Sequence, residues 1–164
     1  MSPSDVPDTT AGINPPVPPH SPQSCIFCRI ASGDVPCHAV YRSDRVLAFL
    51  DVHPVRPGHV LIIPRDHHAY FDDVPAATAT EIMLLGQRMA PLMRSRFAAQ
   101  KVAFFYTGTD IAHAHAHIVP MVEAGDVTSR RYIREETVTF QQVPRMPDDA
   151  LAGIANVIVS ALQG

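Results

Sequence analysis

The sequence lacks long apolar runs. No run in its 164 residues approaches the roughly 18 consecutive apolar residues that a membrane span needs. Residues 1–24 also lack the apolar h-region of a secretory signal peptide. We therefore expect a cytoplasmic protein that has no membrane partner.

An excess of positive charge is missing as well. Thirteen lysines and arginines face sixteen aspartates and glutamates, which gives a net charge of −3. Nucleic-acid-binding domains usually carry a basic patch, and this sequence clusters arginine only at Arg130, Arg131 and Arg134. The charge pattern predicts no nucleic-acid partner.

Cysteine is scarce, whereas histidine is abundant. The three cysteines are Cys25, Cys28 and Cys37, an odd number that includes a Cys-x-x-Cys pair. This usage suits metal or thiol chemistry in a reducing compartment better than a disulfide framework. The nine histidines fall largely between His53 and His117, so that part of the chain is the first place to search for chemistry.

The composition divides the chain into two parts. Residues 1–24 hold seven of the sixteen prolines and few large apolar side chains, so they cannot offset the entropy of ordering and are predicted to be disordered. Residues 25–164 are predicted to form a single domain. A domain of that size buries about two thirds of its unfolded surface, and it needs no disulfide scaffold.

Hydrophobic periodicity predicts an α+β fold. The predicted strands are residues 38–42, 45–50, 60–63, 102–106 and 113–121. The predicted helices are a short one or a turn over 25–32, a long one over 75–99 and a last one over 147–162.

The long predicted helix carries an apolar stripe and two irregularities. Pro91 is expected to kink it or divide it in two, because proline lacks an amide proton and clashes with the preceding turn. Met83 and Leu84 lie outside the stripe, which indicates broad burial of this helix, in a core or in an interface.

Three histidines alternate with apolar residues at His113, His115 and His117. In an extended strand such residues share one face, about 7 Å apart, while the alanines between them share the other. A face of this kind is compatible with a metal site, a phosphate-handling site or a merely polar surface. Solvated faces usually carry lysine, glutamate and threonine, so the pattern favours histidine chemistry.

This run resembles the signature of the histidine triad (HIT) family of nucleotide hydrolases and transferases. Upstream segments match the family in order and spacing, and the resemblance covers about residues 25–121. These segments are Cys25-Ile26-Phe27-Cys28-Arg29-Ile30, Gly33-Asp34-Val35-Pro36, Phe49-Leu50-Asp51-Val52 and Gly58-His59-Val60-Leu61-Ile62-Ile63-Pro64-Arg65-Asp66-His67. The resemblance implies a HIT-like fold: an antiparallel sheet of about five strands, one long helix and a C-terminal helix, commonly assembled as a homodimer.

The resemblance also implies a catalytic mechanism. His115 would attack the α-phosphorus of a nucleotide to form a nucleotidyl-histidine intermediate, which water then hydrolyses. His117 would contact phosphate oxygens and stabilise developing charge. A histidine at this third position goes with the hydrolase branches of the family, whereas the transferase branch typically has glutamine.

The nucleotide would lie on residues from the upstream segments. Asp51 matches the acidic residue that receives the ribose hydroxyls. The positions that match the nucleobase pocket are Phe27, Ile30, Val35, Phe49 and Val52. Such an apolar pocket is expected to discriminate poorly between purines.

The chain departs from the family next to the phosphate. Asp110 stands where many members have a serine that donates to phosphate, and an ionised carboxylate would repel that group. Either Asp110 turns away to orient a histidine, or the leaving group differs. The family asparagine of the preceding strand is absent too, and Thr107 and Thr109 are alternative donors.

Some bacterial-type members join the Cys-x-x-Cys pair to two histidines around zinc. Alone, such a pair is equally compatible with two small buried residues. The matching positions are Cys25, Cys28, His67 and His113, with His68 as a rival to His67. Four such ligands close a tetrahedral site and imply a structural zinc ion. His59 matches a family position that we expect to be structural.

Two functions from different classes remain. The first is a hydrolase that cleaves at the α-phosphate of a purine nucleotide, either a nucleoside phosphoramidate or a dinucleoside polyphosphate, with a divalent cation as an optional companion of the substrate. The alternative is a nucleotide-binding or interaction module with little turnover. A nucleotide that binds without being consumed would favour the module.

Overall fold

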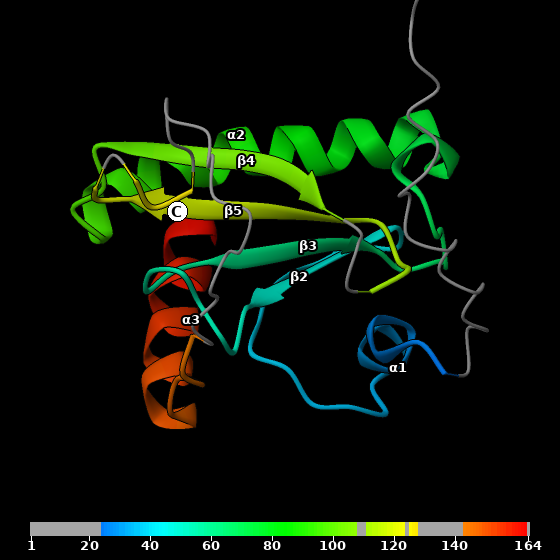
Figure 1. Ribbon diagram of the computed structural model, residues 1–164, viewed down its shortest axis with the longest axis horizontal. Coiled ribbons are helices and arrows are strands. Elements are labelled where there is room, and N and C mark those ends of the chain that lie inside the picture. The colour runs from blue at the N-terminus through cyan, green and yellow to red at the C-terminus, as the bar shows by residue number, and fades with distance from the viewer. Residues whose placement is uncertain (1–23, 108–110, 124, 128–142, 164) are drawn as a thin grey trace, which may run out of the picture.

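The computed structural model describes residues 24–107, 111–123, 125–127 and 143–163 (Figure 1). The predicted disordered segment therefore lies outside the described residues except for Ser24, and so does Asp110. The elements in chain order are α1 (Ile26–Ser32), β1 (Ala39–Arg42), β2 (Val46–Leu50), β3 (Val60–Pro64), a 3₁₀ turn η1 (Phe71–Asp73), α2 (Ala76–Arg96), β4 (Lys101–Thr107), β5 (His115–Met121) and α3 (Asp148–Gln163). The predicted α+β class, with a C-terminal helix, is confirmed.

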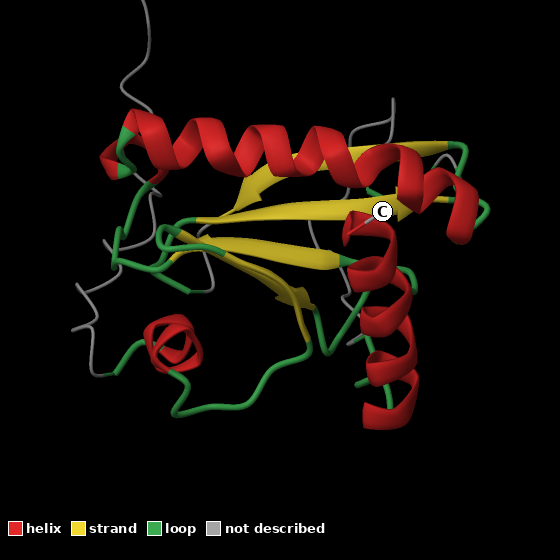
Figure 2. Ribbon diagram, turned by 180° about the vertical axis from the view of Figure 1, so that it is seen from behind, coloured by secondary structure: helices red, strands yellow, loops and turns green. Residues whose placement is uncertain are grey.

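The five strands form one antiparallel sheet in the order β1-β2-β3-β5-β4. The strand β2 is buried along its whole length because both faces of the sheet are covered. Its residues alternate between two cores, with Leu47 and Phe49 on one face and Val46, Ala48 and Leu50 on the other. The helix α1 covers the first face, and α2 and α3 cover the second (Figure 2).

The long helix runs unbroken from Ala76 to Arg96 through Pro91, so the predicted division into two helices is wrong. Its apolar stripe packs on the sheet through Ile82, Leu85, Met89 and Met93. At Gly86 an added Cβ would lie 2.9 Å from the Phe104 ring, so this glycine lets the helix approach β4 closely.

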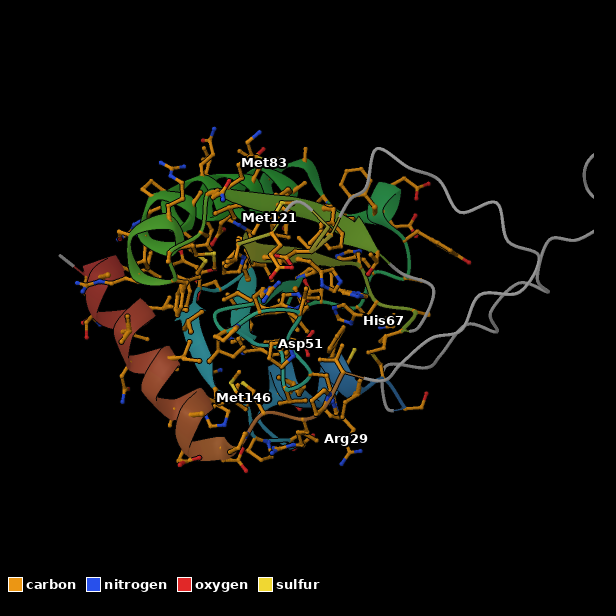
Figure 3. The ribbon with its side chains drawn as sticks, turned by 60° about the vertical axis from the view of Figure 1, so that its left-hand side comes forward. Arg29, Asp51, His67, Met83, Met121 and Met146 are labelled. Atoms are coloured by element: carbon orange, nitrogen blue, oxygen red, sulfur yellow. The ribbon has the colours of Figure 1, made fainter. Side chains whose placement is uncertain are left out.

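Burial of α2 is narrower than the sequence suggested. Met83 and Leu84 are 48% and 58% exposed, and Figure 3 shows Met83 on the outer side of the helix. The prediction of broad burial is therefore wrong for the chain by itself. Among the described residues, no helix is both long and apolar enough to cross a membrane.

The strand that carries the histidines begins later than predicted, at His115 instead of His113. The backbone N–H of Ala114 donates to the carbonyl of His68, 2.6 Å away, and so leaves the sheet ladder. Only His115 and His117 therefore share the predicted strand face, opposite the buried Ala116 and Ile118. Because His113 lies before the strand, the strand geometry does not direct its ring toward this face.

Candidate active site and metal centre

A cavity of 760 Å³ lies on the α1 face of the sheet. Its walls come from α1, from β2 and the turn after it, from β5, and from the segment that leads into α3. His115 and His117 line this cavity together with Asp51 and Thr107. The structure therefore brings the residues predicted to hold phosphate and ribose into one space.

The backbone sets the tautomer of His115. Its Nδ1 lies 2.7 Å from the carbonyl oxygen of His113, and a carbonyl can only accept, so Nδ1 carries the proton. The other ring nitrogen, Nε2, then holds a lone pair and lies 3.0 Å from the Thr107 hydroxyl. The predicted nucleophilic atom is thus unprotonated and lies at the cavity wall.

A chain of hydrogen bonds continues from Thr107 to a fourth histidine. Thr107 Oγ1 is 2.7 Å from Nε2 of His117, and Nδ1 of His117 is 2.9 Å from Nε2 of His59. The N–H of Val55 donates to Nδ1 of His59, 3.3 Å away. Because His59 Nδ1 accepts, its Nε2–H donates to His117, whose Nε2–H donates to Thr107, and Thr107 donates to His115.

Local structure holds His59 in this chain. Gly58 has a φ of 91°, in the left-handed region that favours glycine, and turns the chain into β3. His59 is only 3% exposed, and this burial lowers its pKa below the ordinary value, although Asp51 nearby opposes the shift. We expected His59 to be structural, and the structure bonds this buried side chain to His117. The sequence signal for a role of His59 was its position directly after Gly58, in a segment that resembles the HIT family.

Aromatic rings fix the planes of both cavity histidines. Phe105 stacks on His117 with ring centroids 4.9 Å apart and planes within 5°, and Phe27 meets His115 edge-on at 5.1 Å. The sequence did not single out Phe105, since an alternating strand residue looks like ordinary core. The register places it directly opposite His117.

Of the expected nucleotide residues that the structure describes, all but Val35 line the same cavity. Phe27, Ile30, Phe49 and Val52 line it, whereas Val35 packs behind them against the α1 core. Asp51 accepts the N–H of His53 through Oδ1 at 2.8 Å, and its Oδ2 lies 3.5 Å from His59. The carboxylate therefore lies between the apolar residues and the histidines.

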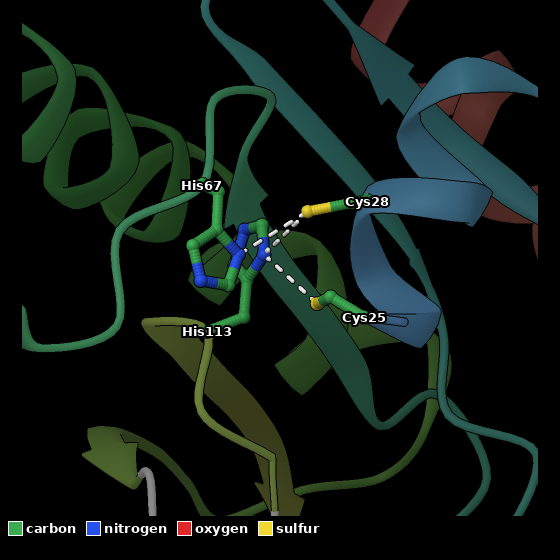
Figure 4. Close-up of side chains that lie close together, drawn as sticks. All are labelled: Cys25, Cys28, His67 and His113. Carbon is green, nitrogen blue, oxygen red and sulfur yellow. Dashed lines mark hydrogen bonds between the residues drawn. The ribbon is translucent and has the colours of Figure 1, made fainter. Parts of the chain in front are cut away.

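A second cluster joins two cysteines of the α1 region to two histidines (Figure 4). The Sγ atom of Cys28 lies 3.2 Å from Nδ1 of His67 and 3.5 Å from Nδ1 of His113, and Sγ of Cys25 lies 3.4 Å from the same His113 atom. All four ligand atoms fall within 4.8 Å of one another. His67, not its rival His68, completes the set.

The chemistry of these donors fits a tetrahedral zinc ion. His113 Nε2–H donates to the carbonyl of Pro64 at 3.0 Å, which leaves the Nδ1 lone pair directed at the sulfurs. Burial lowers the pKa of His113 to about 4, and burial beside Cys25 raises the pKa of Cys28 to about 12. Both shifts favour the neutral forms of His113 and Cys28 when no ion is bound, whereas zinc would hold the thiols as thiolates.

Comparison with known proteins now identifies the family. Residues 32–124 match the family model of the HIT domain, and the chain belongs to this family. An uncharacterised HIT-like protein of Methanocaldococcus jannaschii is 32% identical over 123 residues, 73% of this chain and 95% of that protein. The adenosine 5′-monophosphoramidase of Saccharomyces cerevisiae is 31% identical over 98 residues, 59% of this chain and 62% of that enzyme.

A solved structure is similar over most of the chain. The zinc-bound histidine triad family protein from Mycobacterium smegmatis has a TM-score of 0.66 and 27% identity, and the match covers 87% of this chain and 96% of that one. The HIT-like fold predicted from the sequence is confirmed.

Proposed function

We propose that this protein is a nucleotide hydrolase that cleaves at the α-phosphate of a purine nucleotide, a nucleoside phosphoramidate or a dinucleoside polyphosphate. Membership of the HIT family and similarity to an adenosine 5′-monophosphoramidase support hydrolysis of a nucleotide. The observation that carries the proposal is the His115 ring, whose Nδ1–H is held by a carbonyl and whose Nε2 lone pair lies at the cavity.

The proposed reaction has two displacements at phosphorus. In the first, Nε2 of His115 bonds to the α-phosphorus, and the leaving nitrogen or oxygen departs with its electron pair. The leaving group takes a proton from His117, directly from Nε2 or through the Thr107 hydroxyl. His117 enters this step as the imidazolium and ends it as the neutral imidazole. In the second, water attacks the phosphorus and returns a proton to His117. The bond to His115 breaks, and the nucleoside monophosphate leaves.

The other residues hold the substrate for this attack. Asp51 accepts the ribose hydroxyls, while Phe27, Ile30, Phe49 and Val52 pack around the base. The Thr107 hydroxyl leaves Nε2 of His115 when phosphorus takes its place, and then donates to a phosphate oxygen. It thereby supplies a donor where the family asparagine is absent.

Turnover tests the proposal directly. Purified protein is incubated with adenosine 5′-phosphoramidate, diadenosine polyphosphates and the guanosine counterparts, beside His115→Ala and the control His68→Ala, which alters a histidine outside both clusters. We expect nucleoside monophosphate from the wild type and the control only, and an acid-labile nucleotidyl adduct after rapid quenching. Binding without turnover of any compound would contradict the proposal and support the binding-module alternative.

We also propose that Cys25, Cys28, His67 and His113 hold a structural zinc ion in the reducing cytoplasm. The ion would join the N-terminal end of α1, the loop after β3 and the segment before β5, and its first and last ligands are 88 residues apart in the sequence. This closed donor set leaves no ligand position for substrate. Elemental analysis of protein purified without chelator is expected to give one zinc per chain, and its absence would contradict the assignment.

We further propose a homodimer built on β4 and α2. The strand β4 lies at the edge of the sheet with its central residues half-buried, and α2 runs beside it with Met83 and Leu84 exposed (Figure 2). Light scattering should give twice the chain mass, and Leu84→Glu should give monomer, whereas the control Asn156→Asp, at an exposed position of α3, should not. A monomeric wild type would contradict the proposal.

A further inference from the structure

The chain leading into α3 forms a wall of the cavity that the sequence did not place there. This closing segment, residues 143–148, is tied to the turn after β2. The N–H of Met146 donates to the carbonyl of Val52 at 2.8 Å, and Nδ1–H of His53 donates to that of Val143 at 2.9 Å. Figure 3 shows Met146 at this position. Two charged residues of the closing segment, Arg145 and Asp148, line the cavity as a result.

These two residues form a polar cluster with His38. Asp148 Oδ1 accepts Nε2–H of His38 at 3.1 Å and Nη2–H of Arg145 at 3.0 Å. The hydrogen bonds from Arg145 and then from His38 hold the pKa of Asp148 below its ordinary value, so the carboxylate is ionised. Within the part of the chain that is described, Oδ2 receives a single long contact of 3.4 Å from Arg145, and the carboxylate keeps capacity to accept more.

The sheet separates the polar cluster from the catalytic histidines. One row of paired residues crosses four strands, from His117 on β5 through Leu61 and Phe49 to Ala39 on β1. Three strand spacings make about 14 Å. His38 directly precedes Ala39, so the polar cluster lies at the far end of the cavity from His117. Phe49, expected to meet the base, lies on β2 between these two ends, and Asp51, expected to meet the ribose, follows directly after β2.

We propose that His38, Arg145 and Asp148 recognise the hydrogen-bonding edge of guanine, so that the site discriminates between purines. The proposal rests on the proposed nucleotide site. Guanine presents two adjacent donors, N1–H and the 2-amino group, and an acceptor, O6. The two oxygens of Asp148 accept both donors when Arg145 turns its guanidinium from Asp148 to O6, while His38 keeps its hydrogen bond to Oδ1. Adenine has no second donor on that edge and leaves part of the carboxylate without a partner.

Binding tests this recognition apart from catalysis. Calorimetry gives Kd for GMP, IMP and AMP with the wild type, Asp148→Asn and Arg145→Gln. The controls are Asp149→Asn, which changes the same charge in the same helical turn, and Arg94→Gln. The ratio of kcat/KM for guanosine and adenosine 5′-phosphoramidates is measured in parallel.

We expect the wild type to bind GMP at least about tenfold more tightly than AMP, with IMP between them because it lacks the 2-amino group. Asp148→Asn and Arg145→Gln should each bring the GMP and AMP constants within about threefold, while both controls keep the wild-type ratio. A wild type that binds AMP as tightly as GMP, or a ratio unchanged in Asp148→Asn, would overturn the inference. A tenfold preference without any turnover would instead overturn only the proposed hydrolase.

Discussion

Two neighbouring histidines of one short run use opposite ring nitrogens. His113 donates Nε2–H to the carbonyl of Pro64 and directs Nδ1 at two cysteine sulfurs. His115 donates Nδ1–H to the carbonyl of His113 and directs Nε2 at the cavity. In both rings a backbone carbonyl selects the tautomer. The difference teaches that the backbone acceptor directs one imidazole at the cysteine sulfurs of the proposed metal site and the next at the cavity.

The largest expected effect comes from removing the cavity imidazole. His115→Asn should lower kcat by at least about a thousandfold, because the variant lacks the nucleophile, while zinc content stays at the wild-type level. Steady-state kinetics and elemental analysis of the same preparation check both halves. Retained turnover would show that the nucleophile lies elsewhere.

The second-largest expected effect comes from removing one ligand of the proposed zinc site. Cys28→Ser should lose zinc and lower Tm by about 10 °C, because a structural ion contributes several kcal/mol and this chain is of moderate size. Calorimetry and zinc analysis measure this, and a chelator should give the same shift on the wild type.

Cys37→Ser serves as the control for that substitution, since Cys37 lies outside the cluster. It should keep both zinc and Tm. If chelation leaves Tm of the wild type unchanged, the ion is not structural.

The hydroxyl that links His115 and His117 is expected to have an intermediate effect. Thr107→Val keeps the shape but removes the hydrogen bonds at 3.0 and 2.7 Å, and should lower kcat about tenfold with little change in KM. Thr107→Ser should restore most of the rate. Equal rates for the valine variant and the wild type would rule out a role in proton transfer.

The smallest effect concerns the pH dependence of stability. Burial lowers the pKa of His59 in the folded state, so above the unfolded value of about 6.5 its stabilising contribution is complete. As the pH falls toward the folded pKa, the unfolded chain gains a proton that the folded chain does not, and stability declines.

His59→Gln removes this titration. Urea unfolding between pH 5 and 8 should therefore show a shallower decline below pH 6.5 in the variant than in the wild type. If the free energy of unfolding changes with pH in the same way in the variant and the wild type, His59 has the same pKa in the folded and unfolded states.

Alternation and turn residues were sufficient to predict the five strands and both longer helices, because burial on one face repeats every two or about 3.6 residues. Local pattern failed at His113, where the Ala114 N–H bonds to the His68 carbonyl instead of continuing the strand. Pro91 left a kink and a division of the helix as alternatives, and the structure excludes the division because the helix continues through the proline.

The sequence by itself determined the family resemblance and the two histidines of the cavity, since these residues lie in short motifs with fixed spacing. The resemblance in turn implied the four candidate zinc ligands. Only the tertiary structure decided that His59 bonds to His117, that Thr107 lies between two imidazoles, and that Arg145 and Asp148 reach the cavity. These contacts join residues up to 110 positions apart. Local sequence does not encode such distances, because sheet order and helix packing set them.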